Sequence, residues 1–462
     1  MFDVVVRGGT VVTPQGAIVV DIGIRDGRIA EVGAELAGGA KEIIAAGFSV
    51  LPGLIDIHLH FNEPGRTEWE GAATGSRALA AGGGTLFFDM PLNSTPCTLN
   101  GHEFDRKAEA LAASSLTDFG LWGGIVPGNR DSLGEMAERG AVGFKAFLCN
   151  SGLPEFPRAD DLTLYEGMRE AARLGLPVAV HAESEEITAA LTERMIRAGR
   201  SDIDAFLESR PLIAEVEAIS RAGVIAREAG CKLHIVHVSS GRGVVAALEA
   251  RSLGTDISIE TCPHYLLFTE DDLRRIGPLA KCAPPLRSIR EQEALWSAVR
   301  NGDIDVIASD HSPCPPDMKQ GDNFFSIWGG IPGVQWTLPA LIQMLPVDRI
   351  AALTSGFGAG RFNISAKGSI AAGFDADLAI VDVTAIQQVT KEKLLHRHPI
   401  SPYLAMEMRG VVITTIQRGE VIYNEGRVAL RPTGRLVRPR LLARSEKGID
   451  AASAAHTQQL SA

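Results

Sequence analysis

Short apolar runs alternate with amphipathic stretches along the middle of the chain. Eight runs rich in Val, Ile, Leu and Phe predict buried strands, at residues 54–60, 85–91, 118–125, 143–148, 177–183, 232–239, 257–266 and 305–311. Between them lie segments such as 162–174 and 214–229, whose apolar residues recur every three or four positions and predict helices packed outside a sheet. Because strands that alternate with helices are parallel, the pattern predicts an α/β fold with a closed (β/α)8 TIM-like barrel over residues 51–366.

The two ends of the chain show a different pattern. Residues 1–50 and 367–430 alternate short Val and Ile runs with glycine turns such as Asp26-Gly27, which predicts short antiparallel strands. Since neither end has enough strands for a stable core, we expect both ends to form one small β-sandwich domain. Residues 431–462 hold several arginines followed by a polar Ala, Ser and Gln run, which predicts a solvated C-terminal arm that is partly disordered.

Composition narrows the classes of partner. A net charge of −11 argues against nucleic acid or an anionic membrane as the main partner, because both select for clustered Lys and Arg. Charged residues near the N-terminus do not fit a secretory signal, and no segment approaches about 18 uncharged apolar residues. The six cysteines are scattered and are typical of reduced thiols in a buried core. We therefore expect a cytoplasmic protein, an enzyme or a scaffold, that binds small molecules.

Two histidines stand at the end of the first predicted barrel strand. His58 and His60 are two positions apart, so their side chains share one face of the strand. Two converging imidazoles can hold a divalent metal ion such as zinc. The motif alone is equally consistent with a pair of histidines that only form hydrogen bonds at a polar strand end.

Further candidate ligands end four other strands. In a barrel of this kind the carboxyl ends of the strands form one rim, where functional residues gather. The fourth, fifth, sixth and eighth strands bring Lys145, His181, His237 and Asp310 to this rim. His234 lies three positions before His237, so we expect it to face the opposite side of its strand.

Lys145 is the least expected residue in this set. Burial of an ammonium group in an apolar strand is costly and lowers its pKa. A neutral lysine amine can add carbon dioxide to become a carbamate, an anionic ligand that can bridge two metal ions. The alternative is a lysine that extends along the strand and leaves its ammonium group in water.

The full set suits two divalent ions about 3.5 to 4 Å apart. Such a pair lowers the pKa of a bridging water and polarises a carbonyl, so the expected chemistry is hydrolysis of an amide-like bond by a metal-bridging hydroxide. Asp310 can be a ligand that also carries the proton to the departing nitrogen, or a ligand alone.

The motifs that hold these residues resemble those of the cyclic amidohydrolases in the amidohydrolase superfamily. The resemblance covers residues 1 to about 430 and includes Gly53-Leu-Ile-Asp-Ile-His-Leu-His60, Phe144-Lys145-Ala, His181-Ala-Glu, His237-Val-Ser-Ser, Glu260-Thr-Cys-Pro-His-Tyr265 and Ser309-Asp310-His. Three further segments, 60–71, 90–96 and 329–334, resemble the allantoinase branch. That resemblance implies opening of the hydantoin ring of allantoin to allantoate in purine catabolism. It also implies two divalent metal ions per subunit, zinc or else cobalt, manganese, iron or nickel, on an N6-carboxylated Lys145, and a homotetramer.

The resemblance also implies substrate contacts. Asn62 stands where dihydroorotases carry an arginine for a substrate carboxylate, which favours a neutral substrate. Asn93 and backbone groups near Ala283 and Gly330 would bind the ring amide and ureido groups, although Asn93 can equally stabilise a turn.

Other features keep the alternatives open. The tyrosine that hydantoinases place shortly after the lysine is missing from Phe147-Leu-Cys-Asn-Ser-Gly152, so the oxyanion must rest on a metal or on backbone N–H groups. His264 and His311 are expected to orient ligands or substrate. The alternatives are a hydantoinase or dihydropyrimidinase, a dihydroorotase, and a non-catalytic scaffold on the same fold.

Overall fold

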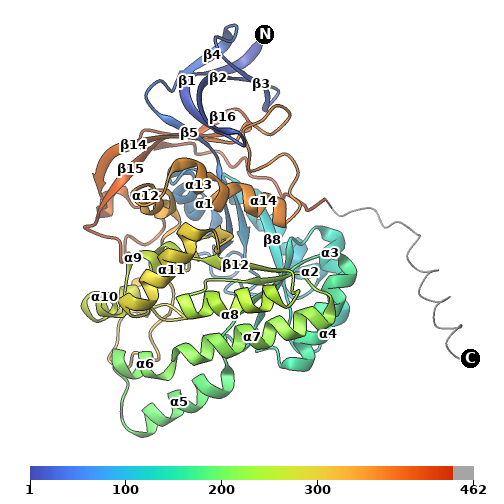
Figure 1. Cartoon of the computed structure of the whole chain (residues 1–462), viewed down its shortest axis with the longest axis vertical. Helices are drawn as coiled ribbons and strands as arrows, with labels where there is room; N and C mark the ends of the chain where they lie inside the picture. Colours follow the sequence, from blue (N-terminus) through green and yellow to red (C-terminus); the bar gives the residue numbers. More distant parts are fainter. Residues whose placement is uncertain (441–462) are drawn as a thin grey trace, which may run out of the picture.

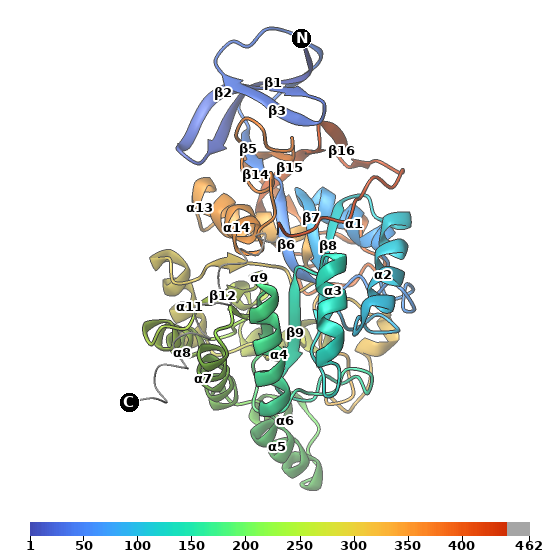
Figure 2. The same cartoon turned by 90° about the vertical axis from the view of Figure 1, so that its right-hand side faces the viewer.

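A ring of parallel strands surrounded by helices forms most of the molecule, and a second sheet stands at one end of it (Figures 1 and 2). This architecture comes from a computed structural model, which describes residues 1–440. No helix in that range is both long enough and apolar enough to span a membrane.

The barrel sheet has eight strands in the order β13-β12-β11-β10-β9-β8-β7-β6. Their bounds are β6 (Leu54–Leu59), β7 (Gly84–Asp89), β8 (Asp118–Gly124), β9 (Gly143–Phe147), β10 (Val178–His181), β11 (Leu233–Ile235), β12 (Ile257–Thr261) and β13 (Val306–Ile307). The two ends of the sheet meet after β13, where Leu59 bridges His311 and the His60 N–H donates to the His311 carbonyl at 2.8 Å. The predicted fold class is confirmed.

Helices connect the strands and cover the outside of the barrel (Figure 1). They are α1 (Ala72–Ala81), α2 (Gly101–Ser114), α3 (Leu133–Arg139), α4 (Asp161–Leu174), α5 (Glu185–Arg197), α6 (Ile203–Ser209), α7 (Leu212–Ala229), α8 (Gly241–Ser252), α9 (Pro263–Leu267), α10 (Glu270–Ile276), α11 (Ile289–Asn301), α12 (Thr337–Ile342), α13 (Val347–Ala351) and α14 (Phe357–Arg361). The start of α4 follows from its cap, since the Asp160 carboxylate accepts the Thr163 N–H at 2.8 Å. Its end follows from Gly175, whose φ of 75° is left-handed.

The second sheet has nine strands and is made from both ends of the chain. Its strands are β1 (Phe2–Thr13), β2 (Gly16–Arg25), β3 (Arg28–Gly33), β4 (Gly39–Ile44), β5 (Ser49–Pro52), β14 (Leu378–Gln388), β15 (Glu407–Gln417), β16 (Glu420–Asn424) and β17 (Arg427–Val428). β5 lies between β1 and β14, so it joins the N-terminal strands to the C-terminal ones in one continuous sheet. The exact domain boundaries at residues 50 and 367 remain a prediction.

Part of the predicted C-terminal arm packs on the barrel. The Phe119 N–H donates to the Arg435 carbonyl at 3.0 Å, and the Val437 N–H donates to the Phe119 carbonyl at 2.7 Å. This segment therefore lies beside the start of β8 instead of extending into solvent. The rest of the predicted arm, residues 441–462, lies outside the described residues.

A buried charge cluster ties the barrel to the second sheet. The Lys367 ammonium lies 2.8 Å from Asp118, at the start of β8, and 2.6 Å from Asp377, which precedes β14. Arg418, at the end of β15, also pairs with Asp118, and the Arg435 N–H donates to the same carboxylate at 3.0 Å. Asp118 thus connects the barrel to both the second sheet and the C-terminal segment.

We predict that Asp118→Ala destabilises the protein, because it leaves the buried Lys367 and Arg418 short of negative charge. The expected loss is about 3 to 5 kcal/mol, the usual cost of removing one member of a buried ion pair. Urea denaturation followed by circular dichroism measures it. Arg130→Ala is the control, since Arg130 pairs with Asp131 on the surface and its loss should leave the midpoint unchanged. Equal urea midpoints for Asp118→Ala and the wild type would contradict the proposed role of Asp118 in joining the barrel to the second sheet.

Candidate metal centre

The six predicted ligands meet at the carboxyl ends of the barrel strands. They line one cavity of about 620 Å³. Two of them lie in or directly after the same strand, and the other four in or after four further strands: His58, His60, Lys145, His181, His237 and Asp310. The five basic residues are buried, and the Asp310 side chain is 14% exposed. Residues up to 252 positions apart are thus brought to one rim, as His58 and Asp310 illustrate.

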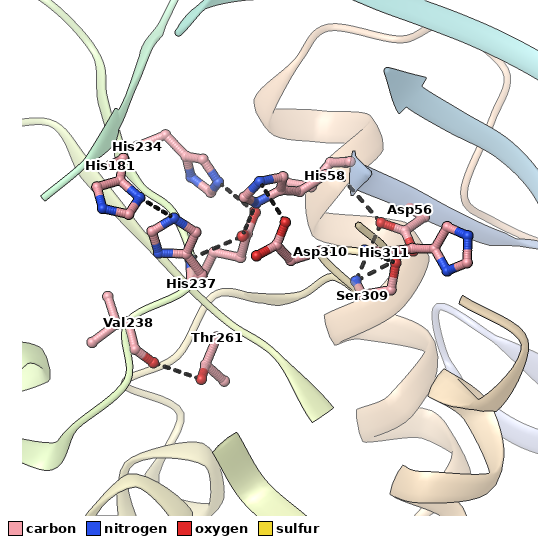
Figure 3. A network of polar contacts seen from close by, with 12 residues as sticks. Asp56, His58, His181, His234, His237, Val238, Thr261, Ser309, Asp310 and His311 are labelled. Atoms are coloured by element: carbon pink, nitrogen blue, oxygen red, sulfur yellow. Dashed lines mark hydrogen bonds and ion pairs between the residues drawn. The ribbon is translucent and has the colours of Figure 1, made fainter. Parts of the chain in front are cut away.

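The ligands form two adjoining groups. Asp310 Oδ1 lies 3.3 Å from His58 Nε2 and 3.5 Å from His60 Nε2. His181 Nδ1 lies 3.0 Å from His237 Nε2, and Figure 3 shows these rings facing each other beside His58. Ligand atoms of His58, His237 and Asp310 lie within 4.8 Å of one another, so the two groups are close enough to form one metal centre.

Lys145 lines the same cavity, in surroundings that are unusual for a buried lysine. Its Nζ is buried and has no hydrogen-bond partner within residues 1–440. It lies 5.2 Å from the centre of the Phe147 ring. Burial lowers the pKa of Lys145 to about 8, although Glu260 and Asp310 oppose this shift. An unpartnered amine with this pKa fits carbamate formation better than a permanent buried ammonium.

The protonation states also suit metal binding. Burial lowers the pKa of His60, His181 and His237, so these rings are neutral at pH 7 and each offers a lone pair. Burial would raise the pKa of Asp310, but His58 and His60 lower it to about 2, so its carboxylate is ionised.

Glu260, at the end of β12, is a functional residue whose role the sequence did not reveal. Its Oε1 lies 2.6 Å from His58 Nδ1 and accepts the His237 backbone N–H at 3.0 Å. Burial would raise its pKa, but His58 and His234 lower it, so the group is an ionised acceptor. This contact fixes the orientation of the His58 ring, so that its Nε2 faces Asp310.

The expectation that His234 faces away from the site was wrong. Its Nε2 lies 3.0 Å from Glu260 Oε2, and its ring is buried beside Trp122. Side chains no longer alternate between the two faces of the strand here, because β11 stops at Ile235 and His237 has a left-handed φ of 41°. His234 consequently supports the same carboxylate that orients His58.

A second carboxylate orients His181. Glu183 Oε2 lies 2.9 Å from His181 Nε2 and also pairs with Arg210, which lines the cavity. Burial would raise the pKa of Glu183, but Arg210 and His181 lower it to about 2. The His181 ring also stacks on Phe147, with centres 4.4 Å apart. These contacts leave His181 Nδ1 directed at His237.

Three of the four residues predicted to contact the substrate line the cavity, and one does not. Asn93, Ala283 and Gly330 line the cavity, and the left-handed φ of 69° at Asn93 is also consistent with its turn role. Asn62 is not among the lining residues in the described part of the chain. It is buried, and its Nδ2 lies 3.5 Å from the Pro313 carbonyl. The structure therefore gives no direct support to Asn62 as a substrate contact.

His264 and His311, which were expected to orient ligands or substrate, have different surroundings. His264 is buried, and this burial lowers its pKa to about 4. The nearby Asp310 acts in the opposite direction but only partly offsets the shift. His311 points away from Asp310 (Figure 3), and its Nδ1 accepts the Gly333 N–H at 3.1 Å. His311 thus holds the Gly333 segment and does not face the ligands.

Comparison with known proteins identifies the family of this chain. The sequence pattern of the amidohydrolase family matches residues 49–422. The chain belongs to the amidohydrolase family. This amidohydrolase is 60% identical to an allantoinase from Solibacter usitatus, over 97% of the chain and 100% of that protein. It is 56% identical to an allantoinase from Rubrobacter xylanophilus, over 95% of the chain and 98% of that protein.

Solved structures show the same fold. The L-hydantoinase (dihydropyrimidinase) from Arthrobacter aurescens superposes on this amidohydrolase with a TM-score of 0.92 at 34% identity. That match covers 95% of the chain and 100% of the hydantoinase. A D-hydantoinase gives a TM-score of 0.89 at 28% identity. The amidohydrolase is therefore an enzyme of the cyclic amidohydrolase group.

We predict that Glu260→Gln weakens metal binding about 10- to 100-fold, because the neutral amide no longer fixes the orientation of the His58 ring. Metal titration with a competing chelator dye measures this affinity. Glu291→Gln is a matched control, since Glu291 is also buried but accepts the Arg242 N–H between the outer helices α8 and α11. Wild-type affinity in Glu260→Gln would contradict the orienting role.

Proposed function

We propose that this amidohydrolase opens the hydantoin ring of allantoin to give allantoate. The high identity to allantoinases over nearly the full chain supports this substrate over the less similar hydantoinases. The observation that carries the chemistry is the buried Lys145 amine, which has no hydrogen-bond partner among the described residues and lines the same cavity as four histidines.

The donor set fits two divalent ions. His58, His60 and Asp310 would hold one ion, His181 and His237 would hold the other, and a carboxylated Lys145 would bridge them. Zinc is the proposed metal, with cobalt, manganese, iron or nickel as alternatives, and carbon dioxide supplies the carboxylate of Lys145. When bound, such a pair polarises the scissile carbonyl and lowers the pKa of water.

Asp310 is the proposed proton carrier. Its carboxylate is ionised, is partly exposed to the cavity and lies near both His58 and His60. It can accept a proton from the attacking water and deliver it to the ring nitrogen that leaves.

The charges of the cavity wall favour an uncharged substrate. The Lys and Arg residues that line it, within the described chain, are Lys145, Arg210 and Lys281. Arg210 is paired with Glu183, and the Lys281 ammonium donates to backbone carbonyls. Among the described residues that line the cavity, no free cation therefore remains for a substrate carboxylate such as that of dihydroorotate, whereas allantoin has no carboxylate.

Two wider features are also part of the proposal. All six cysteines are buried and free, which supports a cytoplasmic location. A homotetramer is proposed from the resemblance to the allantoinase branch.

The substrate proposal predicts that the zinc-loaded enzyme turns over allantoin at least about tenfold faster, in kcat/KM, than hydantoin or dihydroorotate. Product formation measured by mass spectrometry gives the three values under one set of conditions. Metal-free enzyme is the control for background ring opening. A preference for hydantoin or dihydroorotate would overturn the assignment.

The bridging role of Lys145 predicts that Lys145→Ala loses bound metal and at least about 100-fold in kcat/KM. A short carboxylic acid such as propionate should restore part of both, because it supplies a carboxylate in the space left by the side chain. Elemental analysis and allantoin turnover measure the two effects. Lys391→Ala, at an exposed position, is the control. Full metal content in Lys145→Ala would show that the bridge is misassigned.

A further inference from the structure

Two buried lysines, one of which lines the cavity, contact one wall of it and take no part in the proposed chemistry. Lys281 and Lys319 are only 4% and 6% exposed. Across residues 1–440, no carboxylate lies within ion-pair distance of either ammonium group. A buried ammonium without a carboxylate partner is costly unless other oxygen atoms surround it. Here those oxygen atoms are backbone carbonyls.

Most of these carbonyls belong to one segment, residues 324–330, which we call the wall loop. Lys281 Nζ donates to the Phe324 carbonyl at 2.6 Å and also to that of Ile327. Lys319 Nζ donates to the Trp328 carbonyl at 3.0 Å and to the Gly330 carbonyl at 2.8 Å. The wall loop contains no helix or strand, so its carbonyls receive few other donors.

The wall loop forms part of the substrate cavity. Its lining residues are Phe325, Ser326, Ile327, Trp328, Gly329 and Gly330. Gly330 packs so tightly that an added Cβ would lie 2.3 Å from the Ser312 carbonyl oxygen. This part of the wall loop therefore packs directly against Ser312 and leaves no space for a side chain at residue 330.

Lys319 also joins the wall loop to a second cavity segment. Its Nζ lies 3.0 Å from the Pro278 carbonyl and 3.5 Å from the Lys281 carbonyl. The segment that starts at Lys281 continues to Ala283, which lines the cavity together with Gly330. One ammonium group thus holds the two backbone segments that carry the expected contacts to the substrate ring.

The geometry points to Lys281 and Lys319 as positioning residues that fix the wall loop so that its backbone can bind the substrate. They act through the loop: Lys319 itself does not line the cavity among the residues described. Several carbonyl dipoles converge on each ammonium group, and without that charge they would repel one another and turn toward water. This inference rests on the proposed function for the identity of the substrate.

The test compares Lys319→Met, which keeps the length of the side chain and removes its charge, with the zinc-loaded wild type. We expect amides of residues 320–333 to exchange hydrogen about tenfold faster, because their carbonyls lose a buried donor. We also expect KM for allantoin to rise about tenfold with kcat within about threefold of the wild type. Metal content should not change, since Lys319 contacts none of the six candidate ligands.

Lys391→Met is the control, because it removes an exposed ammonium and should change none of these values. Unchanged exchange in residues 320–333, faster exchange with an unchanged KM, or loss of metal in Lys319→Met would each overturn the inference. Lys281→Met is a second variant that must show the same faster exchange even if Lys319→Met does not fold.

The two proposals can fail separately. Hydrogen exchange needs no substrate, so it tests the lysines even if the wild type leaves allantoin intact. In that case the KM comparison uses whichever of hydantoin and dihydroorotate the wild type turns over.

Discussion

The whole site depends on the contact that closes the barrel. His60 donates its N–H to the His311 carbonyl at 2.8 Å, and this hydrogen bond joins the first strand to the end of the last. It fixes Asp310 beside His58 and His60, although the aspartate is 250 or more residues away in sequence. An open sheet would leave the carboxylate and the imidazoles on opposite edges, so ring closure assembles the ligands.

Buried carboxylates around this centre hold the ligand histidines in place. Glu260 supports His58, and Glu183 supports His181, so each group of ligands has an ionised carboxylate behind one of its rings. These carboxylates remain ionised because their other oxygen atoms and neighbours bring further donors, such as His234 and Arg210. Lys145 has no such partner within the described chain, and this difference supports the proposal that it is carboxylated.

The sequence was most informative where local pattern decides the structure. Each of the eight apolar runs overlaps a barrel strand, and the strand ends gave the residues that meet at the rim. It was least informative where the chain leaves regular geometry. His234 and Asn62 were misplaced or left unsupported because left-handed residues, at 41° in His237 and 62° in Asn62 itself, redirect the backbone beyond the strands. The partners of Glu260, Lys281 and Lys319 are set by tertiary packing, which no local spacing encodes.

The place of β5 in the second sheet has a consequence for how the protein is made. β5 ends at Pro52 and pairs with Leu378–Val381 of β14, so its outer edge has no partner until more than 300 further residues have left the ribosome. During synthesis the first five strands carry an open edge that can pair with other chains. The N-terminal strands therefore cannot complete their sheet until the whole barrel sequence has been synthesised.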